Sequence, residues 1–232
     1  MNVRFLLVGL YLVLVWSCNS KPELKLNPQN FSLKPFKHLY ISGNNEISSS
    51  PIVRFSSSYT LRCDSSEINS LKLSYNGDTL TITIVKPLFQ GICDGCTDSN
   101  YNPYNSYSLA ISAPNLESIT SKVDFKLREV STEQLMIKII ADTLTPYSDH
   151  SYPEHVNCYI DNVNIKELQY EGNSRCSLTI GEKTKFDVMT INMDGDSWLT
   201  IDPRAITGKL SIQAKGQLKT SLYKNAIEAL QR

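Results

Sequence analysis

Short runs of alternating apolar and polar residues, separated by turn residues, extend along the chain from residue 36 onward. Residues 71–75 and 79–84 are the clearest pair of such runs, with Asn76-Gly77-Asp78 between them. Alternation with a period of two is typical of a strand with one buried face, and Asn-Gly supplies the positive φ angles of a tight turn. The pattern therefore predicts a β-hairpin over residues 71–84.

The second half of the chain repeats one pattern, in which an alternating strand is followed by a glycine and a second alternating strand. The copies cover residues 168–178, 191–199 and 210–218. Their glycines are Gly172, Gly195 and Gly216, and residues 119–127 and 137–142 are earlier copies without a glycine. A period near 20 residues with turns at one corner indicates a β-solenoid, whose stacked coils bury one continuous core.

Three segments do not follow this repeat. Residues 87–105 and 145–157 are long insertions, which we expect to bulge from corners of the solenoid. Residues 222–232 place four apolar side chains on one helical face, those of Leu222, Ala226, Ile227 and Leu230. Two interpretations of this end remain open: a short amphipathic helix that covers the edge of the last coil, or a frayed tail.

The first residues are typical of an export signal. Arg4 precedes an apolar run over residues 5–16, which is too short to span a bilayer as an anchor. The run ends in Val15-Trp16-Ser17-Cys18, which resembles the bacterial lipobox, whose cysteine is acylated after cleavage. The alternative is an ordinary secretory signal with a chance cysteine.

We therefore expect a lipoprotein signal peptide over residues 1–17, a lipid-anchored tether over 18–34 and the solenoid domain over 35–232. Several acyl chains, such as palmitate, on Cys18 would hold the protein on a membrane without a spanning helix. The expected location is the outer membrane, facing the periplasm or the cell surface. The 23 basic and 23 acidic residues balance, so we expect no nucleic-acid partner.

The order of these features resembles a family of bacterial secreted proteins, the putative auto-transporter adhesin head, or GIN domain. The resemblance is carried by residues 36–43, 76–82 and 111–116, and by the corners at residues 172–174 and 195–197. It implies an all-β fold, a right-handed single-stranded β-helix, here with an N-terminal hairpin region and a C-terminal capping helix. The resemblance supplies no catalytic residue, and adhesion is suggested by the family name alone.

Five cysteines remain besides Cys18, and they are Cys63, Cys93, Cys96, Cys158 and Cys176. A thioredoxin-like site needs a helix after the first cysteine of C-x-x-C, a haem site needs histidine where Thr97 stands, and zinc needs two further ligands. A structural disulfide in an oxidising compartment, either within the loop or from Cys93 or Cys96 to Cys63, or inert thiols, fits better. Cys158 and Cys176 lie near one coil apart, within disulfide reach. Metal and redox roles for the C-x-x-C pair stay open, and no cofactor is expected.

A second candidate site follows these cysteines in the first insertion. Tyrosine offers a flat apolar ring with a polar tip, which suits contact with a sugar or a protein. The residues concerned are Tyr101, Tyr104, Tyr107, Asn102 and Asn105. They form a recognition loop for a glycan or an envelope protein, or else the tyrosines fold back and cover the coil edge.

Acidic and basic residues near the last corners raise the question of catalysis. Asp194, Asp196, Asp202 and Arg204 lie where turn chemistry alone favours aspartate, and His38, His150 and His155 have no recognisable nucleophile beside them in sequence. We therefore expect no catalytic residue and no metal site. The predicted function is a non-catalytic envelope lipoprotein for binding, adhesion or structure; the alternative is a polysaccharide lyase or hydrolase on a β-helix.

Overall fold

The computed structural model describes residues 27–43, 50–86, 88, 92–93, 106–107, 109–128, 134–142, 156–173 and 175–222. These residues form strands and two short 3₁₀ helices, η1 (Ile68–Ser70) and η3 (Pro203–Ala205). The predicted all-β class is confirmed. No helix within the described ranges is long and apolar enough to cross a membrane.

Two large sheets make up the fold. Sheet A has nine strands in the order β1 (Pro28–Ser32), β4 (Thr60–Asp64), β9 (Leu109–Ala113), β3 (Ile52–Phe55), β11 (Phe125–Arg128), β13 (Val156–Asp161), β15 (Cys176–Ile180), β17 (Ser197–Ile201) and β19 (Leu218–Leu222). Sheet B has eight, in the order β18 (Ile206–Lys215), β16 (Lys185–Asp194), β14 (Asn164–Asn173), β12 (Gln134–Asp142), β10 (Ser118–Ser121), β2 (His38–Gly43), β6 (Thr79–Ile84) and β5 (Leu71–Asn76). The short strands β7 (Ile92–Cys93) and β8 (Ser106–Tyr107) pair separately.

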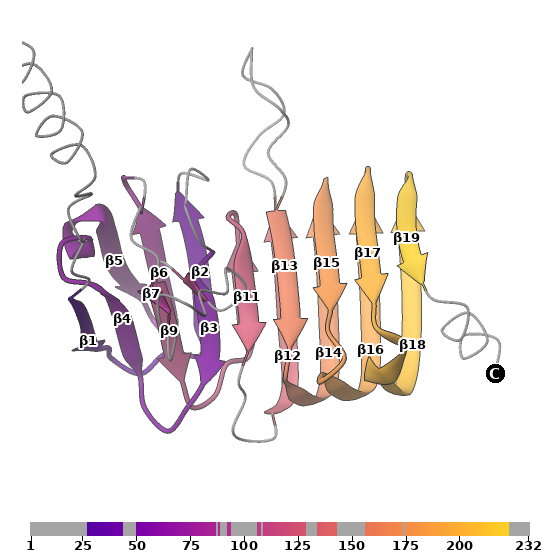
Figure 1. The fold of residues 1–232 in the computed structure, drawn as a ribbon, viewed down its shortest axis with the longest axis horizontal. Coiled ribbons are helices and arrows are strands. Elements are labelled where there is room, and N and C mark those ends of the chain that lie inside the picture. Colours follow the sequence, from indigo (N-terminus) through magenta and orange to yellow (C-terminus); the bar gives the residue numbers. More distant parts are fainter. Residues whose placement is uncertain are drawn as a thin grey trace, which may run out of the picture.

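From β10 onward the chain alternates between the two sheets, so each coil contributes one strand to each sheet (Figure 1). Neighbouring coils pair in parallel, and Leu168, Met189 and Leu210 stand opposite one another in three successive coils. This stacking is the β-solenoid that the repeat predicted, with two sheets dominated by parallel pairs.

The glycine corners were predicted only in part. Gly195 and Gly216 do stack at one corner, where the Gly195 N–H donates to the Lys215 carbonyl at 2.8 Å. Gly172, in contrast, pairs with Met193 inside the sheet and is buried. A Cβ at this position would lie 3.1 Å from Cε1 of Tyr170, so packing against that ring, and not a turn, explains the glycine.

The N-terminal hairpin was predicted correctly, but its place in the fold was not. Strands β5 and β6 pair antiparallel, yet β6 also pairs in parallel with β2 and is therefore a solenoid strand. Asn76 pairs with Thr79, so the two turn residues are Gly77 and Asp78, and Gly77 alone of the three has a positive φ, at 56°. The Asn-Gly turn prediction was thus wrong by one position.

The tether prediction also needs a correction. Strand β1 lies within the predicted tether of residues 18–34 and pairs antiparallel with β4 at the edge of sheet A. The Asn27 N–H donates to Oδ2 of Asp64 at 2.6 Å and fastens the start of this strand. Cys18 lies outside the described residues, so lipidation stays a prediction. Of the predicted capping segment over residues 222–232, Leu222 ends strand β19 and is therefore not helical, and the rest lies outside the described residues.

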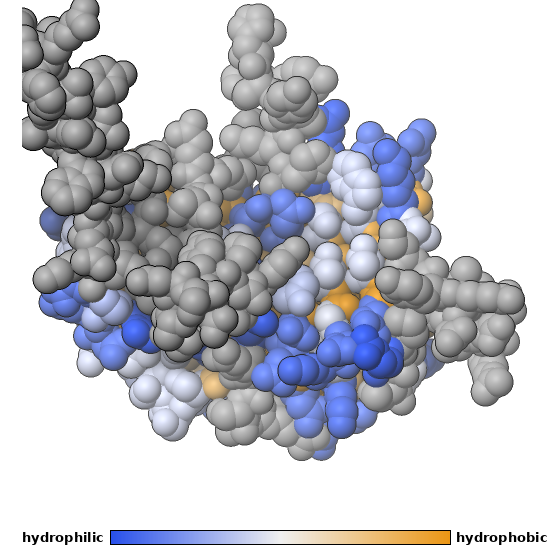
Figure 2. Space-filling view, in the orientation of Figure 1, coloured by the Kyte–Doolittle hydropathy of each residue, from blue (hydrophilic) through white to orange (hydrophobic). Residues whose placement is uncertain are grey.

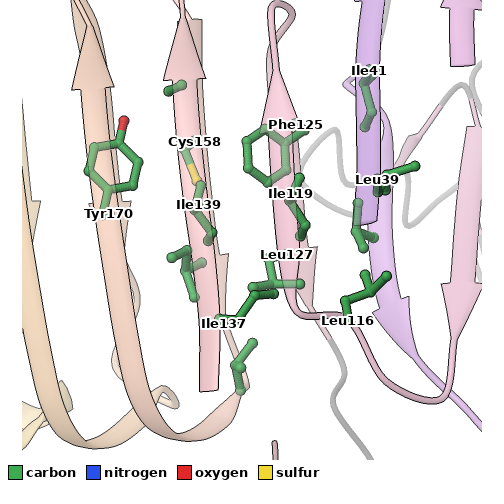
Figure 3. Packing of buried hydrophobic residues seen from close by; sticks show 14 of the residues in the cluster. Leu39, Ile41, Leu116, Ile119, Phe125, Leu127, Ile137, Ile139, Cys158 and Tyr170 are labelled. Carbon is green, nitrogen blue, oxygen red and sulfur yellow. The ribbon is translucent and has the colours of Figure 1, made fainter. Parts of the chain in front are cut away.

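One hydrophobic core fills the space between the sheets. Inward-facing side chains alternate with outward-facing ones along each strand, and Leu39, Ile119 and Ile137 are fully buried on three adjacent coils (Figure 3). Burying such a side chain contributes about 1.5–3 kcal/mol. Since no coil can bury its own apolar face alone, this core requires the coils to stack.

Candidate functional site

A small hollow lies on the outer face of sheet A, where β11, β13 and β15 run side by side. Its volume is about 210 Å³, and its walls are Ser50, Phe125, Lys126, Asn157, Cys158, Tyr159, Ser177 and Thr179. Figure 2 shows the face on which β13, β15 and β17 lie, where residues of intermediate and high hydropathy gather between hydrophilic ones. This hollow is the best candidate for a recognition site in the described part of the chain.

Strand alternation and coil register bring the lining residues together. On β11, Phe125 and Leu127 face the core, which turns Lys126 outward between them. The parallel register then places Lys126 opposite Tyr159, and Tyr159 opposite Thr179. The hollow therefore combines a cation, an aromatic ring and a hydroxyl from three successive coils.

Cations lie over both aromatic rings on this part of sheet A. The guanidinium carbon of Arg128 is 5.9 Å from the centre of the Tyr159 ring, and the Arg128 Nη2 is 3.4 Å from Oδ2 of Asp161. Two coils further on, Nζ of Lys219 is 5.3 Å from the centre of the Trp198 ring. Cation–π contacts of this kind hold a ring in place on an otherwise mobile surface position.

Small residues separate the two rings. Ser177 and Thr179 are the outward residues of β15, between Tyr159 on β13 and Trp198 on β17. Neighbouring strands are about 4.8 Å apart, so the two aromatic strands are about 10 Å apart. Tyr159 stands opposite Thr179 and Trp198 stands opposite Ser177, so the two rings occupy diagonal positions on either side of β15.

The electrostatics of the hollow are set by Lys126. Its burial, and after that the charge of Arg128 two residues on, lower the pKa of the Lys126 ammonium below its usual value of 10.5. Asn157 is fixed beside it, since its backbone N–H and Nδ2 donate to the two oxygens of Asp124 at 2.7 and 2.9 Å. The hollow thus carries a partly desolvated positive charge and an oriented amide.

The predicted recognition loop lies almost entirely outside the described residues, namely Tyr101, Asn102, Tyr104 and Asn105. Tyr107 is in β8 and pairs with Ile92, and Cys93 pairs with Ser106 in the same small sheet. Cys96 is not described. The recognition loop and the disulfide of the C-x-x-C pair therefore stay predictions.

Sequence reasoning missed the hollow on sheet A. Its residues follow the ordinary outward alternation of solenoid strands, and Lys126 and Tyr159 are 33 positions apart across an irregular insertion. Only the register between β11 and β13 reveals that they are neighbours. A sequence signal that could have drawn attention to it is the outward Lys-x-Arg pair on β11.

The remaining described cysteines are buried thiols. Cys63, Cys158 and Cys176 are thiols, the Cys176 Sγ–H donates to the Ala141 carbonyl at 3.3 Å, and burial raises the pKa of Cys63 to about 11 and that of Cys176 to about 12. The register places Cys176 opposite Val156 and Cys158 opposite Leu178, so the two cysteines are diagonal neighbours on adjacent coils. Thiols with such pKa values stay protonated and are poor nucleophiles. Their predicted pairing remains untested.

The acidic residues at the last corners behave as turn residues. Oδ1 of Asp194 accepts the Gly195 N–H at 2.8 Å, as expected for an aspartate in a turn. Asp202 accepts hydrogen bonds from Nε and Nη2 of Arg204 at 3.0 and 2.9 Å, which hold the pKa of its carboxyl below the usual value. A carboxyl of this kind stays ionised and does not serve as a general acid.

The structure gives His38 a serine neighbour that the sequence did not reveal. Nδ1 of His38 is 2.9 Å from Oγ of Ser118, and Nε2 is 3.9 Å from Oε2 of Glu117. Glu117 also pairs with Nζ of Lys37 at 2.8 Å. The backbone N–H groups of Glu117 and Ser118 both donate to the Lys37 carbonyl. Neither is therefore available for an oxyanion, and we interpret the cluster as a polar surface network.

Comparisons with known proteins give structural matches only. No family model matches the chain, and no curated protein matches it. Fourteen solved chains match in structure. A "putative adhesin" from Bacteroides fragilis has a TM-score of 0.42 and 13% identity, over 86% of this chain and 98% of that chain. A second "putative adhesin", from Parabacteroides distasonis, has a TM-score of 0.34 and 13% identity, over 85% of this chain and 96% of that chain.

A "putative cell adhesion protein" from Clostridium sporogenes has a TM-score of 0.29 and 10% identity, over 84% of this chain and 97% of that chain. The chain is thus similar to solved chains named as adhesins, in agreement with the sequence resemblance to the adhesin head family. At these identities and TM-scores, the matches carry no argument about the site or about what the chain binds.

Proposed function

We propose that the chain is a non-catalytic binding or adhesion module of the cell envelope, anchored to a membrane through acylated Cys18. The proposal includes a right-handed winding of the solenoid and a capping helix after the last coil. The observation that supports a binding role is the hollow on sheet A. Recognition sites combine apolar and aromatic area with a few placed polar groups, and Tyr159, Asn157 and Lys126 supply these at one place.

Anchoring is tested by fractionating cells that express the full chain. We expect the wild type in the membrane fraction and the Cys18→Ala variant outside it. Each acyl-chain methylene that is buried in the membrane contributes about 0.8 kcal/mol to the free energy of membrane binding. Metabolic labelling with a palmitate analogue should mark the wild type alone. An unlabelled wild type that still sediments with membranes would contradict lipid anchoring.

Binding is tested by immobilising the full chain and incubating it with envelope glycans and envelope proteins. We expect retention of a component by the wild type and by a Tyr40→Ala control, and loss of that retention in Tyr159→Ala. Tyr40 is a matched control because it is also a half-buried tyrosine, on β2 of sheet B. Equal retention by the wild type, Tyr40→Ala and Tyr159→Ala would contradict a binding role for the hollow.

One observation favours the alternative, a carbohydrate-active enzyme. A lysine with a lowered pKa is a suitable base, and Lys126 lies in the hollow beside Arg128. In a β-elimination, Lys126 would take the proton next to a sugar carboxylate, a C=C bond would form, and the glycosidic oxygen would leave and take up a proton. Incubation with uronate polymers, followed by ultraviolet detection of the unsaturated product, separates this activity from binding alone.

A further inference from the structure

We infer that the hollow on sheet A binds an acidic sugar residue of a glycan, with Tyr159 against the sugar ring and Lys126 against its carboxylate. This inference deepens the proposed function and rests on it. It assigns the ligand a chemical class that the comparisons do not address.

The size of the hollow suits a single sugar residue. Pockets that enclose drug-sized ligands measure about 300–1,000 Å³, whereas this one measures about 210 Å³. It is therefore too small to enclose an oligosaccharide, but it can receive one ring of a chain whose remaining residues lie along the outer face of the sheet.

The chemistry of the walls suits a sugar ring. The apolar face of a sugar packs against an aromatic ring, and the Tyr159 ring is held in place by Arg128. Ser177 and Thr179 line the hollow from β15. Their hydroxyls can each donate and accept, as hydroxyls of a sugar require.

The charges of the hollow favour an acidic ligand. Lys126 and Arg128 are successive outward residues of β11, and burial, and after it the charge of Arg128, lower the pKa of Lys126. Arg128 also pairs with Asp161, and Lys126 is one of the residues that line the hollow. A carboxylate placed beside Lys126 would relieve this repulsion and offset the desolvation of the ammonium, which a neutral sugar cannot do.

A second ring extends the site along the solenoid axis. Trp198 lies on β17 opposite Ser177, diagonally across β15 from Tyr159, and Lys219 lies over it. A glycan that fills the hollow and continues toward the last coil would therefore reach a second aromatic surface. We expect Trp198 to contribute less than Tyr159, because it does not line the hollow.

The test measures binding of acidic oligosaccharides to the full chain by calorimetry. The probes are oligogalacturonate, oligomannuronate and sialyllactose, each compared with its carboxyl-reduced form, which keeps the sugar but removes the charge. We expect at least one acid to bind tenfold or more tightly than its reduced form. Lys126→Gln should abolish that difference, while the control Lys138→Gln, a lysine of sheet B, should keep it.

Further variants separate the ring from the charge. Tyr159→Phe keeps the aromatic face and should retain binding, whereas Tyr159→Ala should weaken both the acid and its reduced form at least tenfold. Circular dichroism and thermal melting check that each variant is folded. Binding of the acids should also weaken as the pH rises through the lowered pKa of Lys126, because the neutral amine no longer pairs with the carboxylate.

Two results would overturn the inference. Equal affinity for each acid and its reduced form would show that the hollow does not recognise the carboxylate. No binding of any probe, together with Tyr159-dependent retention of an envelope protein, would show a protein ligand and leave the proposed function standing. If Tyr159→Ala retained every envelope component as well as the wild type does, the proposed function would be contradicted too.

Discussion

The two ends of the solenoid are built differently. In the C-terminal part, from β12 to β19, successive coils stack in chain order and each contacts its neighbours alone. In the N-terminal part, the coil of β2 and β3 lies between the coil of β6 and β9 and that of β10 and β11 (Figure 1). The antiparallel strands β1, β4 and β5 then close this end.

The two parts should therefore respond differently to destabilising substitutions. Coils stacked in chain order behave as a one-dimensional array, in which the last member adds only its own interface. The interleaved N-terminal coils join segments up to 80 positions apart, as in the pair of His38 and Ser118. Damage to the interleaved part should therefore affect the whole fold, whereas damage to the last coil should stay local.

The largest expected effect comes from shortening a core side chain in the interleaved part. Ile41 on β2 is fully buried between β6 and β10, whereas Ile212 on β18 is only partly buried and, among the described strands, pairs with β16 alone. We expect Ile41→Ala to reduce the free energy of unfolding by about 2–5 kcal/mol, and Ile212→Ala to reduce it by less than half as much. Urea unfolding of the full chain measures both, and equal losses would contradict the comparison.

A glycine where β2 meets β6 gives the next prediction. Gly43 has a φ of 133°, and a Cβ there would lie 2.2 Å from the Ile84 carbonyl oxygen. Gly43→Ala should cost about 1–3 kcal/mol for the backbone conformation alone, plus the displacement of β6. The control is Gly77→Ala at the hairpin turn, where no atom lies within 4 Å of the added Cβ. If thermal melting ranks the control as the more damaging change, close packing of the two coils is refuted.

The edge strand β1 gives a pH-dependent prediction. Burial raises the pKa of the Asp64 carboxyl, but hydrogen bonds from Ser66 and the Asn27 N–H together lower it below the usual value. Since the folded-state pKa is depressed, this contribution is present above pH about 3.9 and is lost as the pH falls through the folded-state value. Asp64→Ala should cost roughly 1–3 kcal/mol at neutral pH.

In Asp64→Ala, the free energy of unfolding should fall less steeply than in the wild type as the pH is lowered into the acidic range. Urea unfolding at a series of pH values would measure this. The control is Asp202→Ala, which removes an ion pair to the exposed Arg204 and should cost about 0–1 kcal/mol. A pH dependence in the acidic range that does not differ between wild type and Asp64→Ala would argue against this role of Asp64.

The smallest effect is expected in the stacked coils and has the opposite sign. The Tyr170 hydroxyl is fully buried and has no hydrogen-bond partner, although Cys158 and Cys176 lie nearby. Because an unpaired buried hydroxyl is costly, Tyr170→Phe should leave the protein as stable or up to about 1–3 kcal/mol more stable. A clear loss of stability in differential scanning calorimetry would indicate a partner for the hydroxyl, such as an ordered water.

Sequence patterns within short segments predicted the structures that depend on neighbouring residues alone. The hairpin of β5 and β6 follows from alternation and a glycine, and the later coils follow from their repeated strands. The position of Gly172 was misassigned, because a buried glycine beside a tyrosine ring and a corner glycine look alike in sequence. Strand β1 was missed because five residues at a sheet edge, mostly exposed, show no hydrophobic alternation.

The sequence by itself determined the all-β class, the stacked coils and the single core, since these depend on which side chains alternate along each strand. Only the tertiary structure decided the order of the N-terminal coils, which depends on long-range pairing such as that between β2 and β10. The same holds for the hollow on sheet A. Lys126 and Tyr159 become neighbours through the register of two parallel strands, and insertions of irregular length hide that register from the sequence.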